Sequence, residues 1–205
     1  MYQSAVLDGT TDKLTIVQHT VDEERGTNTL KSMWGNIGGS RIILENTDQT
    51  LDEAFQTKNV TITHEQRVKS VLLQDILDNM FADKTRRDKP VVIMKLDIET
   101  FECRALLGSP DLFSLQQPYY VPFLVMEWYF ATKNEEDKYV FPKSCPQTKL
   151  LRMRDLLLDK GYEPWGEAGE GKWVRLSAKK ALRWYKTNVV WRHKMAPLSV
   201  LPKVL

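Results

Sequence analysis

Residues 91–108 read VVIMKLDIETFECRALLG, and this stretch decides the fold that the chain is expected to adopt. It opens with an apolar, largely β-branched run that is too short for a helix, which is typical of a strand buried on both faces. Asp97 and Glu99 follow where the run ends, and a helical segment stopped by Gly108 comes next. Since open parallel sheets bind ligands just beyond the carboxyl ends of their strands, Asp97 and Glu99 are candidate site residues.

Later segments repeat this alternation of strand and helix. Residues 123–128 form a second apolar run with Glu127 near its end, which predicts a second buried strand. The remaining expected elements are a helix over 150–160, a short strand over 161–165 and a final strand over 187–192. This order predicts an α/β fold with a mostly parallel sheet, finished by two strands close enough to pair antiparallel. Residues 1–205 are expected to form a single domain.

The first ninety residues are more polar and less regular. Their expected elements are short strands over 4–7, 13–18 and 60–63 and a helix over 68–81. Residues 21–59 are expected to be irregular. Within them, the glycines of WGNIGGSR (34–41) invite a phosphate-binding interpretation, but their spacing fits neither common phosphate-binding motif and no strongly apolar strand precedes them. A plain loop is therefore favoured.

Composition excludes several classes of protein. The chain has 205 residues, of which 42% are hydrophobic and 27% charged, as in ordinary globular domains. A net charge of +2 is too small to imply a nucleic-acid or membrane partner by itself. No apolar run is long enough to span a membrane and no signal-peptide pattern follows Met1, so a cytoplasmic location is the default expectation. Cys103 and Cys145 do not make a disulfide framework, and Cys103 is expected to be a small buried hydrophobe.

The central stretch resembles the FkbM family of methyltransferase domains. The family pattern is a buried strand running into Lys-Ile-Asp-Val-Glu-Gly-x-Glu and then a helix ending in Val-Leu-x-Gly. Here the corresponding residues are KLDIETFE (95–102) and ALLG (105–108). Further segments resemble the family in the same order, namely SAVL (4–7), LLQDIL (72–77), MEW (126–128), GY (161–162) and NVVWR (188–192).

The resemblance implies a Rossmann-like methyltransferase sheet, mostly parallel with a C-terminal antiparallel strand pair. Two departures qualify this expectation. Thr100 replaces the family's glycine, so the turn after Glu99 lacks a residue suited to positive φ. Nothing before Ser4 supplies the first strand, the glycine-rich turn or the second acidic strand of such folds. The chain is therefore expected to represent the domain from its third strand onward, N-terminally incomplete.

By the same resemblance, the activity expected is methyl transfer from S-adenosylmethionine to a hydroxyl of a sugar or other small molecule. Asp97, Glu99 and Glu127 would line the acceptor pocket, with a small-molecule or glycan acceptor as the partner. Ser4 and Ala5 would lie near the adenine of the cofactor. The alternative is a non-catalytic or truncated domain of this type that serves as an interaction scaffold.

Structural interpretations of the same residues remain open. Asp97 could cap the following helix, while Glu99 and Glu102 favour its positive amino end. Clustered carboxylates could bind a metal ion, although the three histidines show no ligand spacing. Residues 179–194 are basic and contain Trp184 and Trp191, which could stack on nucleic acid if exposed. Packing of these tryptophans is favoured, so nucleic acid is not the expected partner.

Overall fold

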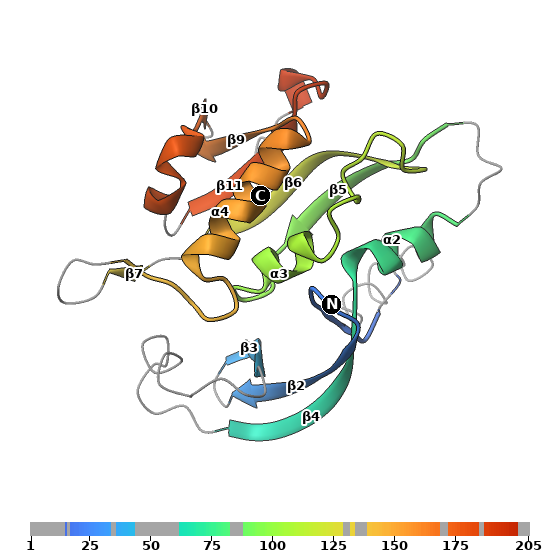
Figure 1. Ribbon diagram of the computed structural model, residues 1–205, viewed down its shortest axis with the longest axis vertical. Helices are drawn as coiled ribbons and strands as arrows, with labels where there is room; N and C mark the ends of the chain where they lie inside the picture. The colour runs from blue at the N-terminus through green and yellow to red at the C-terminus, as the bar shows by residue number, and fades with distance from the viewer. Residues whose placement is uncertain are drawn as a thin grey trace, which may run out of the picture.

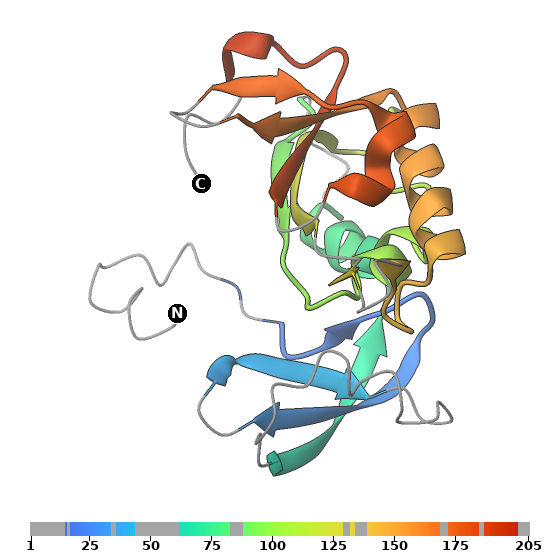
Figure 2. The same ribbon diagram turned by 90° about the vertical axis from the view of Figure 1, so that its left-hand side faces the viewer.

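The computed structural model describes residue 15 and residues 17–33, 36–43, 62–82, 88–128, 132–133, 139–168, 172–184 and 187–200. These residues form two main sheets, one of five strands and one of four, and a short two-stranded ribbon. The four-stranded sheet lies beside the end of the larger one in both views (Figures 1 and 2).

The five-stranded sheet has the order β10-β9-β11-β6-β5. Its strands are β5 (Val91–Leu96), β6 (Tyr120–Trp128), β9 (Tyr162–Glu167), β10 (Trp173–Arg175) and β11 (Thr187–His193). One face of this sheet is covered by the helices α2 (Leu73–Met80), α3 (Glu102–Leu107) and α4 (Gln147–Asp159) (Figure 2). We call this the helical face and the opposite side the second face.

The four-stranded sheet has the order β1-β4-β2-β3. It consists of β1 (Thr20–Val21), β2 (Gly26–Met33), β3 (Asn36–Ile43) and β4 (Ile62–Val71). The ribbon pairs β7 (Thr132–Lys133) with β8 (Tyr139–Val140), and 3₁₀ turns occupy η3 (Ala178–Arg183) and η4 (Leu198–Val200).

The predicted Rossmann-like, mostly parallel sheet is wrong. Among the described strands, parallel pairing is confined to β5 with β6 and β1 with β4, whereas every other pair is antiparallel. The alternation of apolar runs shows where strands lie but not in which direction they run. Short links such as residues 168–172 between β9 and β10 can only return the chain antiparallel, because a parallel crossover needs a dozen residues or more.

Two predictions for the first part of the chain are also corrected. Residues 26–33 and 36–43, predicted to be irregular, form the strands β2 and β3. The predicted helix over 68–81 begins only at Leu73, because β4 pairs with β2 as far as Ser70 and with β1 as far as Val71. The helix starts there because the Asp75 carboxylate accepts the Leu72 N–H at 3.2 Å. The strand predicted over 4–7 lies outside the described residues, and residues 17–18 of the strand predicted over 13–18 are not in a strand.

The elements predicted from residue 91 onward are confirmed in position as β5, α3, β6, α4, β9 and β11. The burial predicted for β5 is only half right. Met94 and Leu96 are buried, but Val91 and Ile93 on the other side of the strand are 65% and 67% exposed. In the described sheet β5 is an edge strand, paired only with β6.

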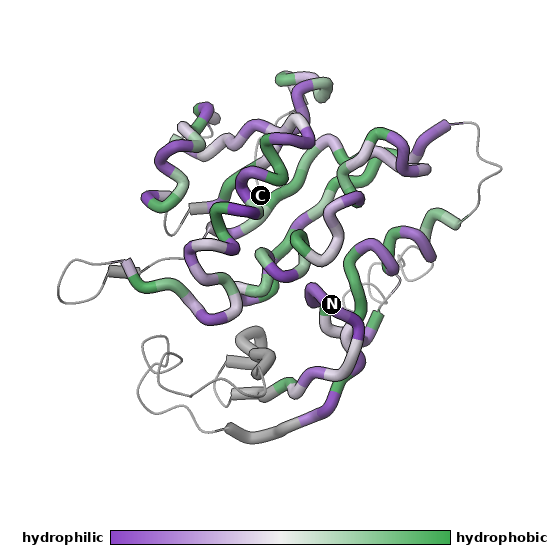
Figure 3. The backbone as a smooth tube through the Cα atoms, viewed as in Figure 1, coloured by the Kyte–Doolittle hydropathy of each residue, from purple (hydrophilic) through white to green (hydrophobic). Residues whose placement is uncertain are grey.

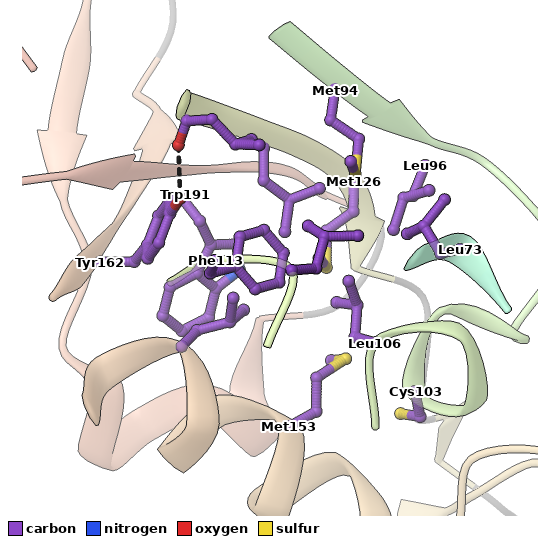
Figure 4. Packing of buried hydrophobic residues seen from close by; sticks show 14 of the residues in the cluster. Leu73, Met94, Leu96, Cys103, Leu106, Phe113, Met126, Met153, Tyr162 and Trp191 are labelled. Atoms are coloured by element: carbon purple, nitrogen blue, oxygen red, sulfur yellow. Dashed lines mark hydrogen bonds between the residues drawn. The ribbon is translucent and has the colours of Figure 1, made fainter. Parts of the chain in front are cut away.

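The main core lies between the helical face of the five-stranded sheet and the helices that cover it. Figure 3 shows that β6 is hydrophobic along most of its length, as expected of a central strand. Figure 4 shows side chains from the helices meeting side chains from the strands in one cluster, among them Leu73, Leu106, Met153, Met94, Leu96, Met126 and Trp191. A smaller cluster of Phe123, Val125, Val190 and Ala196 lies on the second face.

Ion pairs join the segment after β1 to two helices that cover the larger sheet. Arg104 of α3 donates to the carboxylates of Asp22 and Glu23, the second at 3.0 Å. Lys149 of α4 contacts the same Glu23 carboxylate at 2.6 Å. Asp22 also accepts from Asn28 of β2 at 3.0 Å. These largely buried pairs therefore fix how the smaller sheet meets α3 and α4.

Replacing Gly108 with alanine is expected to disturb this contact. A Cβ at Gly108 would lie 2.4 Å from the Glu23 Cα and 2.9 Å from the Asp22 carbonyl oxygen, and both are backbone atoms. Because backbone cannot move aside like a flexible side chain, we expect a loss of about 1–3 kcal/mol in the free energy of unfolding, measured by urea denaturation. Gly26→Ala is the matched control, since its Cβ would meet nothing within 4 Å. Equal effects of the two substitutions would contradict this packing.

Candidate functional site

The predicted acids Asp97 and Glu127 lie next to each other at one end of the sheet. Leu96 of β5 pairs with Met126 of β6 in a parallel register, so the residues that follow them are neighbours. Both carboxylates are exposed. Glu127 alternates with the second-face residue Val125, and Asp97 continues the alternation of the exposed residues of β5. The two side chains therefore belong to the second face, at the carboxyl ends of adjacent parallel strands.

Two further polar residues adjoin this pair. The Lys95 ammonium lies 3.3 Å from the Asp97 carboxylate. Asn188 of β11 pairs with Glu127 across the sheet and is also exposed. We call Asp97, Glu127 and Asn188 the polar row, since Glu127 and Asn188 lie on the neighbouring strands β6 and β11 and Asp97 directly follows the neighbouring strand β5. The sequence did not single out Asn188 as a site residue, because its place beside Glu127 depends on the antiparallel register of β11.

Glu99 lies in the turn between β5 and α3 and is exposed. The backbone of this turn is left-handed at two residues that are not glycine, with φ of 55° at Glu99 and 76° at Thr100. For a β-branched residue such as Thr100 this conformation is costly. The Thr100 hydroxyl forms a hydrogen bond of 2.7 Å with the Ser144 hydroxyl, which helps to hold the turn. The turn thus keeps the shape of a glycine turn without the glycine.

Thr100→Gly is expected to be more stable than Thr100→Ala by about 1 kcal/mol. Both variants lose the hydroxyl that contacts Ser144, so the comparison isolates the left-handed backbone. At a position with negative φ the order would be reversed, because glycine then costs about 0.5–1 kcal/mol relative to alanine. Urea denaturation of the two variants measures the difference, and a more stable alanine variant would contradict the left-handed turn.

Glu102 is the buried acid of this region. Its residue is only 2% exposed, and its Oε1 accepts the Ile98 N–H at 3.0 Å. Its Oε2 has no hydrogen-bond partner among the described residues. Burial raises the pKa of Glu102 to about 7. The sequence suggested only a favourable charge at the helix start, because burial of this first-turn position depends on how the preceding turn packs.

The helix-capping role considered for Asp97 is not observed. The residue before α3 is Phe101, and no side chain caps the helix. Asp97 instead contacts Lys95 on the strand side of the turn. Its exposed carboxylate is thus paired with Lys95 and takes no part in capping the helix.

A disulfide joins this turn region to the segment before α4. Cys103 of α3 pairs with Cys145, with a Cα–Cα distance of 5.5 Å. The predicted burial of Cys103 is confirmed, since the residue is fully buried. The prediction that Cys103 is unpaired is wrong. Together with the contact between Thr100 and Ser144, the disulfide fixes residues 144–145 against the start of α3.

The other features considered from the sequence are the adenine-binding residues, a metal site and tryptophans that stack on nucleic acid. Ser4 and Ala5 lie outside the described residues. No group of three or more His, Cys, Asp or Glu side chains within the described ranges is arranged to hold a metal ion. Trp191 is fully buried, and its ring packs with those of Trp128 and Trp184 at centroid distances of 5.8 and 6.1 Å. Stacking on nucleic acid would require exposed rings, so Trp191 packs in the core instead.

Comparison with known proteins yields no relative for this chain. No family model matches it, no curated protein matches it, and no solved structure matches it. Among the helices of the described residues, none combines the length and apolar character needed to cross a membrane.

Proposed function

We propose that the chain takes part in methyl transfer from S-adenosylmethionine to a hydroxyl group of a sugar or other small molecule. The observation that supports this proposal is the juxtaposition of Asp97 and Glu127 at the carboxyl ends of adjacent parallel strands. Ligands commonly bind at such strand ends. The resemblance of residues 95–102 to methyltransferase domains supplies the reaction class.

The polar row has the groups that an acceptor hydroxyl needs. S-adenosylmethionine, when bound, supplies an electrophilic methyl group on a positively charged sulfur. The carboxylate of Asp97 or Glu127 accepts a hydrogen bond from the acceptor hydroxyl and takes its proton, while Asn188 offers an amide to a neighbouring hydroxyl. Glu99, at the exposed turn, borders the same end of β5. Ser4 and Ala5 are assigned to the adenine end of the donor by the resemblance alone.

The residues of the polar row fit the acceptor side of this reaction. Two exposed carboxylates attract both hydroxyl groups and the positive charge of the donor. The close backbone approach that a glycine-rich turn gives to a nucleotide has no counterpart among the described residues.

Removal of either carboxylate tests the proposal. Calorimetric titration with S-adenosylmethionine should give micromolar binding, and radiolabelled methyl should appear on at least one member of a panel of sugars and hydroxylated metabolites. Asp97→Asn and Glu127→Gln should each lower that transfer by about 10²-fold or more, the usual contribution of a general base. Asp111→Asn is the matched control, because its side chain is 82% exposed and does not belong to the polar row.

A non-catalytic interaction scaffold is the second candidate, and the exposed edge of β5 favours it. Val91 and Ile93 present apolar side chains on a strand with one free edge among the described strands. Such an edge can pair with an extended peptide of a partner protein. If the titration shows no binding of S-adenosylmethionine and the radiolabel assay shows no methyl transfer, the scaffold function is favoured over catalysis.

A further inference from the structure

A cavity of about 950 Å³ lies where β4 runs into α2, away from the polar row. The two elements are consecutive in the chain and adjacent in Figure 1. The cavity is lined by Thr15, Val17, His19, Arg25, Gly26, Lys69, Ser70, Val71, Asp75, Ile76, Asn79 and Met80. Its volume is within the range of sites that enclose small organic ligands, about 300–1,000 Å³.

The charged residues of the cavity favour an anion. Among the described residues of the lining, Asp75 is the only carboxylate, and Arg25 donates to both of its oxygens at 2.7 and 2.9 Å. This contact with Arg25 lowers the pKa of Asp75, so its charge stays engaged with the guanidinium. Lys69 and His19 also line the cavity, and the charge of Lys69 adds to that of Arg25 in lowering the pKa of Asp75. Arg25 and Lys69 together carry more charge than Asp75 offsets, so the described part of the lining keeps a net positive charge that an anionic ligand can balance.

The remaining walls favour an apolar body. Val17 and Met80 are 45% and 57% exposed, and both line the cavity together with Ile76 and Val71. Exposed apolar side chains that gather around a cavity gain free energy when a ligand removes them from water. A cavity with apolar walls and a net positive charge is complementary to a molecule with an apolar part and a single negative group.

We propose that this cavity binds an amphipathic carboxylate, such as a medium-chain fatty acid. Lys69 binds the carboxylate, and Val17, Ile76 and Met80 contact the hydrocarbon chain. This site is separate from the proposed methyl-transfer site, whose two carboxylates repel anions. Each can therefore exist without the other.

Calorimetric titration of the full chain with octanoate, octan-1-ol and acetate tests the proposal. We expect octanoate to bind at least tenfold more tightly than either of the others, which lack the charge or the chain. Equal affinity for octan-1-ol would overturn the role of Lys69, and equal affinity for acetate would overturn the apolar part of the site. Absence of octanoate binding would overturn the proposal as a whole.

Two substitutions assign the binding to this cavity. Lys69→Met keeps an unbranched side chain that is one atom shorter and removes the charge, and it should weaken octanoate binding about tenfold while leaving octan-1-ol unaffected. Lys194→Met is the matched control, because Lys194 is exposed and does not line the cavity. Urea denaturation of both variants shows whether they remain folded. If both variants weaken octanoate binding equally, the site lies elsewhere and the proposal is wrong.

Discussion

Removal of the disulfide, by the double substitution Cys103→Ala and Cys145→Ala, is expected to lower the free energy of unfolding by about 2–4 kcal/mol. The bond closes a chain segment with a sequence separation of 42 residues, and it joins α3 to the segment that leads into α4. A cross-link of this span restricts the unfolded chain far more than the folded one, in which both cysteines are fully buried. The loss is a large part of the stability of an ordinary domain.

Urea denaturation with and without a thiol reductant measures this effect. The reductant should destabilise the natural chain by a similar amount and leave the double alanine variant unchanged. That variant is therefore the control for any other action of the reductant. Two free thiols in the native chain under oxidising conditions, measured with a thiol reagent after unfolding, would contradict the disulfide.

The central part of the fold was predictable because its signals are local. Residues 91–96 and 120–128 are apolar runs bounded by turn residues, and they form β5 and β6. The helix over 147–159 follows from apolar spacing and is closed by Gly161, whose φ of 87° requires glycine. For such segments the pattern of the chain itself carries the information.

The direction and neighbours of the strands were not predictable in the same way. A strand buried on both faces and an edge strand covered on one face can have the same sequence, as Val91 and Ile93 show. The strand β2 is mostly polar and β3 contains two adjacent glycines, so their pattern indicates a loop. Pairing of β2 with the long strand β4, and of β3 with β2, overrides that local preference. Tertiary hydrogen bonding, which no local pattern encodes, decided these elements.

The residues of the candidate site that were predicted from the sequence are likewise those with a local signal. The sequence identified Asp97 and Glu127 because each follows an apolar run, and the register of β5 and β6 brings them together. It did not identify Asn188, whose place depends on β11, or the burial of Glu102. It also left Cys145 unpaired, because a separation of 42 residues carries no local signal of contact. Candidate groups at strand ends were thus accessible to sequence reasoning, while contacts between distant segments were not.

The stability of the chain is expected to fall as the pH rises from about 4.5 to about 7, because of Glu102. Burial raises the pKa of its carboxyl from 4.5 to about 7 in the folded chain. Below pH 4.5 the group is protonated in both states, so its contribution is fully present. Between the two values the unfolded chain releases the proton and the folded chain retains it, so folding becomes progressively less favourable. A difference of this size corresponds to a loss of about 3 kcal/mol across the window.

Glu102→Gln isolates this effect from other titrating groups. The amide oxygen of glutamine can still accept the Ile98 N–H, but the side chain no longer titrates. His193 acts in the opposite direction, since burial lowers its pKa and its folded state gains stability as the pH rises. The difference in unfolding free energy between the natural chain and Glu102→Gln, measured by urea denaturation from pH 4.5 to 8, removes that contribution. It should change by about 3 kcal/mol in favour of the variant as the pH rises. A difference that stays constant over this range would mean that Glu102 is ionised within the folded chain, which a buried Oε2 without a hydrogen-bond partner makes costly.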